Sequence, residues 1–336
     1  MMKMGSTFFL RLFLSLWLAL AASSSWSATP VQTHGALAVK GNQIVDKTGH
    51  PVAFSGPSFF WSNTGMQQEK YYDAAMVRYY RREWNATVVR AALGVDPKGG
   101  YLDDPQGNQR RVFAVVDAAI AEGLYVIVDW HSHHAEDHPD AAIRFFQGVA
   151  RKYGKHPNII YEIYNEPLRE AGWSSVVKPY AEKVVAAIRA IDPDNLIIVG
   201  TPAWSQDVDV AAADPLNDFR NIAYSLHFYA GTHKQALRDK AQVALDKGIA
   251  LMVTEWGTVN ADGDGGVDRD ETLKWFAFMK QHHLTNCNWA VSDKAEGASH
   301  FKPGTPADGK IDDDRLTPSG LFVKELVRHW DDTAAR

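Results

Sequence analysis

The sequence predicts an α/β fold, a (β/α)8 TIM barrel preceded by a short β-hairpin. Three observations predict it: eight strand-like apolar runs, amphipathic helical patterns between them, and no Gly-x-Gly-x-x-Gly motif after the first run. Apolar strands that alternate with helices are typical of a parallel sheet covered by helices. An open doubly wound sheet is the alternative, but eight units fit a barrel and such sheets commonly carry the glycine motif.

The first 27 residues have the pattern of a secretory signal peptide. Lys3 and Arg11 precede the apolar run "LFLSLWLALAA" (12–22), and Ser25 and Ser27 form a small-x-small cleavage pattern. A membrane anchor is the alternative, yet the run is shorter than the ~20 apolar residues of a span. We therefore expect a secreted protein, extracellular or periplasmic, that has no membrane segment once residues 1–27 are removed.

The segment 36–56 comes next, and the turn-forming pairs Gly41-Asn42 and Thr48-Gly49 predict a hairpin there that leads into the first strand. Strand-like runs follow at 51–56, 86–93, 124–131, 159–167, 195–202, 222–230, 250–257 and 287–293. Apolar residues three and four apart predict helices within 139–157 and 176–193. Since no Pro- or Ser-rich linker interrupts this rhythm, we expect 28–336 to be a single domain.

Two glutamates stand out at the ends of these runs, Glu166 in the fourth and Glu255 in the seventh. In a barrel the carboxyl ends of all strands meet at one face, where the active site is built. Two acids across a cleft can divide proton donation and nucleophilic attack between them, as glycoside hydrolysis requires. The alternative for each is a structural salt bridge.

Aromatic residues also gather at or just after the predicted strand ends. Sugar rings stack their C–H faces on aromatic planes, so a polysaccharide cleft is commonly lined in this way. Core filling is the alternative for each, and most of all for Trp256, which directly follows Glu255. The residues are Trp61, Tyr101, Trp173, Trp204, Tyr229, Trp256 and Trp289.

Composition excludes several other classes. Without Lys3 and Arg11, 33 basic residues face 40 acidic ones, a charge near −7 that argues against nucleic acid or an anionic membrane as partner. Cys287 is the one cysteine, so no internal disulfide can form.

A zinc site at His131, His133, His134 and His138 is an alternative, but no further ligand set is apparent. The segment 262–271 matches a calcium loop only loosely. We expect no metal and no cofactor.

Five segments together resemble glycoside hydrolase family 5, in particular its bacterial endo-β-1,4-glucanases: "IYEIYNEP", "VTEWGT", "LHFYAGTH", "VDWHSHH" and "NWAVSDKAEGAS". The resemblance runs from about residue 34 to the end of the last helix. It implies a barrel that hydrolyses internal β-1,4-glucosidic bonds with retention through two glutamates. We also expect the protein to be a monomer.

The resemblance also implies roles. Glu166 matches the acid/base and Glu255 the nucleophile, while Asn165 would bind the 2-hydroxyl of the cleaved sugar. The other matching positions are Arg90 and Tyr229 beside the nucleophile, His131, His227 and Trp289 around the cleaved sugar, Trp61, Tyr101, Lys294 and Glu296 on the non-reducing side, and Trp204 on the leaving side.

One departure concerns the loop after the first strand, where some relatives carry a histidine and this chain has Phe59 and Phe60. The rival activities are a mannanase, a xyloglucanase or a transglycosylase, because one fold hosts many specificities. A noncatalytic polysaccharide-binding barrel is a rival of another class, and it would be expected to lack one of the glutamates.

Overall fold

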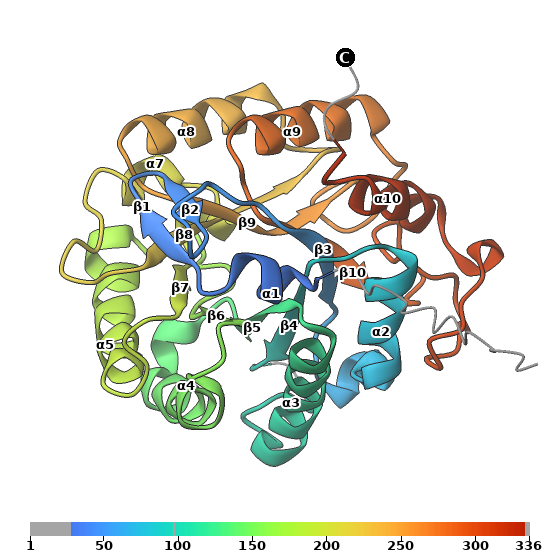
Figure 1. Cartoon of the computed structure of the whole chain (residues 1–336), viewed down its shortest axis with the longest axis horizontal. Coiled ribbons are helices and arrows are strands. Elements are labelled where there is room, and N and C mark those ends of the chain that lie inside the picture. Colours follow the sequence, from blue (N-terminus) through green and yellow to red (C-terminus); the bar gives the residue numbers. More distant parts are fainter. Residues whose placement is uncertain (1–27, 97, 333–336) are drawn as a thin grey trace, which may run out of the picture.

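Eight parallel strands close into a barrel in the computed structural model, which describes residues 28–96 and 98–332. The predicted signal peptide lies outside the described residues. The strands follow one another around the barrel and β10 pairs with β3, so the predicted fold is confirmed (Figure 1). The barrel strands are β3 (Ser55–Phe59), β4 (Val88–Gly94), β5 (Tyr125–His131), β6 (Ile159–Glu162), β7 (Leu196–Val199), β8 (Ile222–Tyr229), β9 (Leu251–Gly257) and β10 (Asn286–Val291).

Helices cover the outside of the barrel, and Figure 1 shows them as a ring around the strands. Their buried faces form one large apolar cluster with the outward-facing strand residues. Among the described residues, no helix combines the length and the apolar character of a membrane span. The main helices are α2 (Ala74–Glu83), α3 (Pro105–Glu122), α4 (Pro139–Tyr153), α5 (Lys178–Arg189), α8 (Gln235–Asp246), α9 (Arg269–Gln281) and α10 (Pro318–Arg328).

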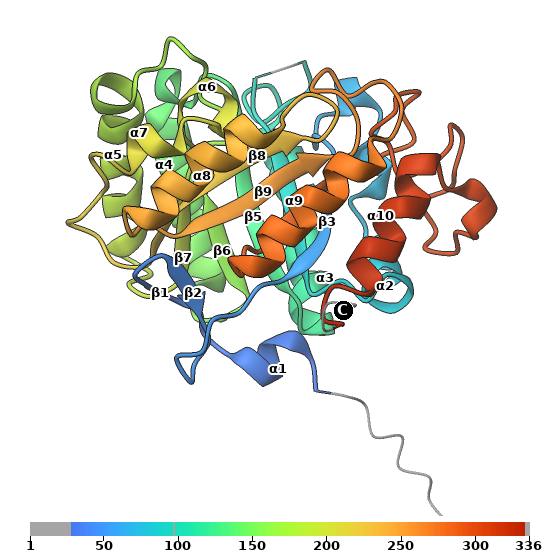
Figure 2. The same ribbon diagram turned by 90° about the horizontal axis from the view of Figure 1, so that it is seen from above.

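The predicted hairpin is present as β1 (Ala38–Lys40) and β2 (Gln43–Val45), paired antiparallel after the short helix α1 (Pro30–His34). Figure 2 shows α1 at the end of the barrel opposite the short helix α6 (Pro202–Ser205). Apolar residues of the hairpin segment pack against the inward residues of several strands, so the hairpin closes the amino-terminal end.

Several predicted strand boundaries are wrong: β3 ends at Phe59 and not at 56, and β7 ends at Val199 and not at 202. The first strand was expected at 51–56, but β3 begins at Ser55, because Val52 donates its N–H to Ile44 and belongs to the hairpin. The fourth was expected to run through 159–167, but β6 ends at Glu162. Beyond it the chain still hydrogen-bonds to the end of β5, now in irregular geometry, and this is the segment that carries Asn165 and Glu166.

Candidate active site

The inward positions of the barrel strands change character along each strand. Successive side chains point to opposite faces, so every second residue faces the barrel interior. In β5, Tyr125 and Ile127 lie in the apolar interior cluster, and the next inward positions are Asp129 and His131. Arg90 follows Val88 in β4 in the same way. The barrel is therefore apolar at its amino-terminal end and polar at its carboxyl end.

Arg90 is the centre of the polar end, and it is fully buried. Its Nε lies 2.7 Å from Glu162, Nη1 lies 2.9 Å from Glu255, and Nη2 lies 2.9 Å from Asp129 and 2.6 Å from Oδ1 of Asn165. The rigid guanidinium fork thus fixes four side chains at once, from β5, β6, β9 and the segment that follows β6. Burial lowers the pKa of Arg90, but the three carboxylates outweigh burial and raise it well above its ordinary value.

Glu255 projects from β9 with both carboxylate oxygens held. The hydroxyl of Tyr229 donates to Oε1 at 2.8 Å, and Nη1 of Arg90 donates to Oε2 at 2.9 Å. Burial and the neighbouring Glu255 charge raise the pKa of Tyr229, so its hydroxyl keeps its proton and remains a donor. A carboxylate fixed in this way is pre-oriented for attack on a substrate atom.

Asn165 has a buried amide donor without a hydrogen-bond partner among the described residues. Because Arg90 can only donate, the oxygen of the Asn165 amide must face it, and the Nδ2 group points elsewhere. Nδ2 is buried and has no hydrogen-bond partner among the described residues. A buried donor without a partner costs stability, so such a group is expected to meet a ligand acceptor.

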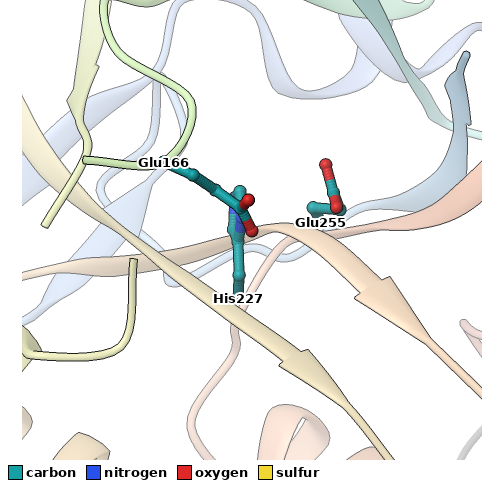
Figure 3. A group of neighbouring side chains, drawn as sticks. All are labelled: Glu166, His227 and Glu255. Atoms are coloured by element: carbon teal, nitrogen blue, oxygen red, sulfur yellow. The ribbon is translucent and has the colours of Figure 1, made fainter. Parts of the chain in front are cut away.

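Glu166 lies four residues beyond β6, and its backbone N–H donates to the carbonyl of Ser132 at 3.3 Å. Its Oε1 lies 3.0 Å from Nδ1 of His227, and its Oε2 lies 3.2 Å from Nε2 of His133. Figure 3 shows the carboxylate beside His227, with Glu255 close by on its own strand. Burial raises the pKa of Glu166, but the hydrogen bonds from His133 and His227 outweigh burial and lower it well below its usual range.

His227 is held as an imidazolium ion. Its Nε2 lies 2.8 Å from the hydroxyl of Thr254, which in turn donates to Glu162 at 2.6 Å. Since the one hydroxyl hydrogen of Thr254 is used, Nε2 must donate, and Nδ1 donates to Glu166. Burial lowers the pKa of His227, but hydrogen bonds to Glu162 and Glu166 raise it to about 9.

A stack of rings forms one wall of the site. The rings of His131 and Trp289 are parallel, with centres 5.1 Å apart, and Phe60 packs 4.9 Å from Trp289 on another side. Trp61 places its ring edge-on to His131. Burial and the charge of Arg90 lower the pKa of His131 to about 3, so the ring is neutral, and its Nδ1 lies 2.7 Å from Asp129. Phe60 has no polar group, and its ring packs against the ring of Trp289.

Trp204 lines a cavity of about 390 Å³ together with Glu166, His227, Tyr229 and Glu255. The side chain is 39% exposed, which is unusual for tryptophan. Ala203, Trp204 and Ser205 all have positive φ angles between 56° and 60°, a left-handed turn that non-glycine residues adopt at a cost. Two hydrogen bonds hold this turn: Trp204 N–H donates to Pro167, and the Ser205 hydroxyl donates to the carbonyl of Asn165.

In the part of the chain that the structure describes, none of the remaining predicted residues is hydrogen-bonded to the carboxylate of Glu166 or Glu255. Lys294 and Glu296 form an ion pair at 2.5 Å in the loop after β10, with the ammonium 5.7 Å from the centre of the Phe60 ring. Tyr101 packs its ring edge-on to Trp130 and Phe145, beside the cluster outside the barrel wall. Trp173 and Trp256 are buried in the core, the alternative stated for each from sequence.

Several residues of the site were not predicted as site residues from sequence. Asp129 and Glu162 are fully buried partners of Arg90. The hydroxyls of Ser225 and Thr254 both donate to the carboxylate of Glu162. His133 was considered only as a zinc ligand. The available signal was the two-residue period: Asp129 lies two residues before His131, and Ser225 two residues before His227.

The four histidines of 131–138 do not form a zinc site. His131 bonds to Asp129, His133 contacts Glu166, and His134 is exposed. Among residues 28–96 and 98–332, the one group of acids and histidines with ligand spacing is Glu166, His227 and Glu255, whose atoms lie within 4.8 Å of one another. Because both nitrogens of His227 donate protons, that ring offers no lone pair to a metal ion.

Comparisons with known proteins agree on one family. The cellulase family (glycosyl hydrolase family 5) matches residues 45–295. The chain is 53% identical to endoglucanase Z of Dickeya dadantii over 95% of its own length and 72% of that protein's length. It is 43% identical to an endoglucanase of Clostridium saccharobutylicum, over 87% of its own length and 65% of that protein's.

Solved structures extend the likeness. A protein of Cytophaga hutchinsonii is 49% identical with a TM-score of 0.87, covering 90% of this chain and 97% of the other. The catalytic domain of Thermobifida fusca endoglucanase Cel5A, solved as a variant in complex with cellotetraose, is 32% identical with a TM-score of 0.84, covering 90% of this chain and 100% of the other. The chain therefore belongs to glycosyl hydrolase family 5, the cellulase family.

Proposed function

We propose that this chain is a retaining endo-β-1,4-glucanase with Glu255 as nucleophile and Glu166 as acid/base. The observation that carries the proposal is the carboxylate spacing: one oxygen of Glu166 lies within 4.8 Å of one of Glu255. Retaining glycosidases hold their two carboxyl groups about 5–5.5 Å apart, whereas inverting enzymes need about 6.5–9.5 Å to admit a water molecule.

The surrounding contacts fit the two roles. Arg90 and Tyr229 hold Glu255 as an oriented anion, as attack on the anomeric carbon requires. The pair of Glu166 and His227 holds a proton between them at neutral pH, which can move to the leaving oxygen as the bond breaks. Asn165 offers its free Nδ2 donor to the 2-hydroxyl, a bond that strengthens in the transition state.

The substrate follows from the relatives and the cleft. The relatives are named endoglucanases, and the Thermobifida fusca domain binds cellotetraose. Reducing-sugar release from a panel of soluble β-glucans, mannans and xylans tests the assignment. We expect cleavage of β-1,4-glucans with a rapid fall in viscosity, and a preference for mannan or xyloglucan would replace the proposal by its rival.

The protein is proposed to be a secreted monomer that binds neither nucleic acid nor membrane. The apolar run before residue 28 supports secretion, and the acidic composition argues against nucleic acid and anionic membrane as partners. Size-exclusion chromatography coupled to light scattering checks the monomer. N-terminal sequencing of the exported protein checks the cleavage site.

We predict that activity needs no added metal ion. The two carboxylates fill both chemical roles, and the imidazolium form of His227 repels a cation. Dialysis against EDTA should leave the rate on soluble cellulose derivatives unchanged. A loss of activity that zinc alone restores would contradict the prediction.

Trp204→Ala and Trp61→Ala are expected to weaken the use of long chains more than that of small activated glycosides. Trp204 lines the cavity that holds both carboxylates, and Trp61 packs edge-on against His131 and His133. We expect both rings to bind sugars away from the broken bond. Loss of a stacked ring costs about 1 kcal/mol, roughly fivefold in kcat/KM. Trp173→Phe, in the core, is the control, and equal losses on both substrate types would assign the rings to folding.

A further inference from the structure

His133 contacts the proposed acid/base, although none of the roles above uses it. Its Nε2 lies 3.2 Å from Oε2 of Glu166, the oxygen that His227 does not bind. The two histidines come from different segments, His133 from the loop after β5 and His227 from β8. The side chain of His133 is 37% exposed, whereas that of His227 is 2% exposed. Each carboxylate oxygen therefore has its own histidine, one buried and one open to the cleft.

The position of His133 is supported by its surroundings. The N–H of His134 donates to the hydroxyl of Ser132 at 2.9 Å, and the hydroxyl of Tyr164, which donates to the carboxylate of Glu136, packs 2.9 Å from the carbonyl of His133. The ring of Trp61 stands edge-on to the His133 ring, with centres 5.9 Å apart. Backbone and ring are both held, so the contact with Glu166 is a built feature of the loop.

We propose that His133 is a positioning residue for the reaction proposed above: together with His227 it holds Glu166 as the anion that accepts a proton in the second step. In that step a water oxygen bonds to the anomeric carbon, and the bond from that carbon to Glu255 breaks with its electron pair returning to the carboxylate. The proton released by the water passes to Glu166, so atoms and charges balance. The inference rests on the proposed function of the two glutamates.

The charges around Glu166 decide how strongly His133 acts. Burial lowers the pKa of His133, but its hydrogen bond to Glu166 raises the pKa above the ordinary value, so the ring carries a positive charge in mildly acidic solution. When Glu255 is bound to the sugar it has no charge. The positive charges near Glu166 are then opposed by one negative charge fewer, and the ionised form of Glu166 is favoured further. The groups that face Glu166 or His133 are His227, Glu255, Arg169, His233, Asp129, Asp96 and His131.

The test measures the second step alone. An activated 2-deoxy-2-fluoro-β-cellobioside should trap the enzyme as its glycosyl-enzyme, and the rate at which activity returns is followed against pH. In that intermediate Glu255 is esterified and does not titrate, so the acidic limb reports Glu166. His133→Gln removes the positive charge, and the pKa of Glu166 should rise. The acidic limb should therefore move upward by about one pH unit or more, as for loss of an opposite charge at this distance.

His134→Gln is the matched control, because His134 is exposed in the same loop. Its acidic limb should coincide with that of the unchanged protein, while His133→Ala should behave as His133→Gln. Trapping at the normal rate shows that a variant is folded, since the first step with this donor needs no proton from Glu166. An unmoved limb in His133→Gln and His133→Ala overturns the inference alone. Failure of the unchanged protein to form any trapped intermediate overturns the proposed function instead.

Discussion

Glu255→Ala and Glu166→Ala should give opposite anomers when azide rescues them. Glu255→Ala lacks the nucleophile and leaves space on the α face of the sugar. Azide that enters there, with an activated β-cellobioside as donor, should yield the α-azide by a single inversion. Glu166→Ala still forms the glycosyl-enzyme from a donor whose leaving group needs no proton, and azide then attacks from the β face. The product should be the β-azide.

On unactivated cellulose both variants should be nearly inactive. Loss of a general acid costs about 10²–10⁴-fold in rate, and loss of the nucleophile removes the covalent route altogether. Glu170→Ala, an exposed residue four positions after Glu166, is the control and should keep full activity. Nuclear magnetic resonance of the products identifies the anomers. Swapped anomers would reverse the two roles, and full activity in both variants would make the glutamates structural.

Much of the fold could be predicted because its signals are local. The apolar runs, their spacing and the turn residues at Gly41 and Gly49 are properties of neighbouring residues, and they predicted the barrel and the hairpin. The boundary of β3 could not be predicted in this way. Val52 and Phe54 look like strand residues, but they pack against the hairpin and the barrel floor, a contact between distant segments.

The site residues also differ in whether their signal is local in the sequence or depends on contacts between distant segments. Glu166, Glu255 and Asn165 were visible because a polar residue followed an apolar run at a strand end. Glu162 sits inside the run and has no such signal, yet its carboxylate meets Arg90 from β4 and Thr254 from β9. His133 was visible only as one of four histidines, since its partner is 33 residues away. Such pairings depend on which strands are neighbours, and that follows only from the closed barrel.

Arg90→Met should cause the largest loss of stability among single changes at the site. The substitution keeps an unbranched side chain but leaves Asp129 and Glu162 fully buried without their cation. Removing one partner of a buried ion pair costs about 3–5 kcal/mol, which corresponds to a fall in Tm of roughly 5–8 °C for a domain of this size. Thermal unfolding followed by circular dichroism measures it. Arg110→Met, on the exposed side of α3, is the control and should leave Tm unchanged.

The pH dependence separates lost charge from lost packing. In the unchanged protein, burial raises the pKa of Glu162, but Arg90 and His227 lower it from 4.5 to about 2. The ionised carboxylate therefore stabilises the fold above pH 4.5, and that contribution is lost as the pH falls towards 2. Without Arg90, burial is opposed by one cation fewer, so the pKa of Glu162 in the folded protein moves upward. Protonation of Glu162 then removes the buried negative charge and reduces the loss of stability in the variant. The difference in Tm should be largest near pH 8 and clearly smaller near pH 5. A difference that stays constant across this range would mean that Arg90 stabilises the barrel by packing, and that the carboxylates around it do not depend on its charge.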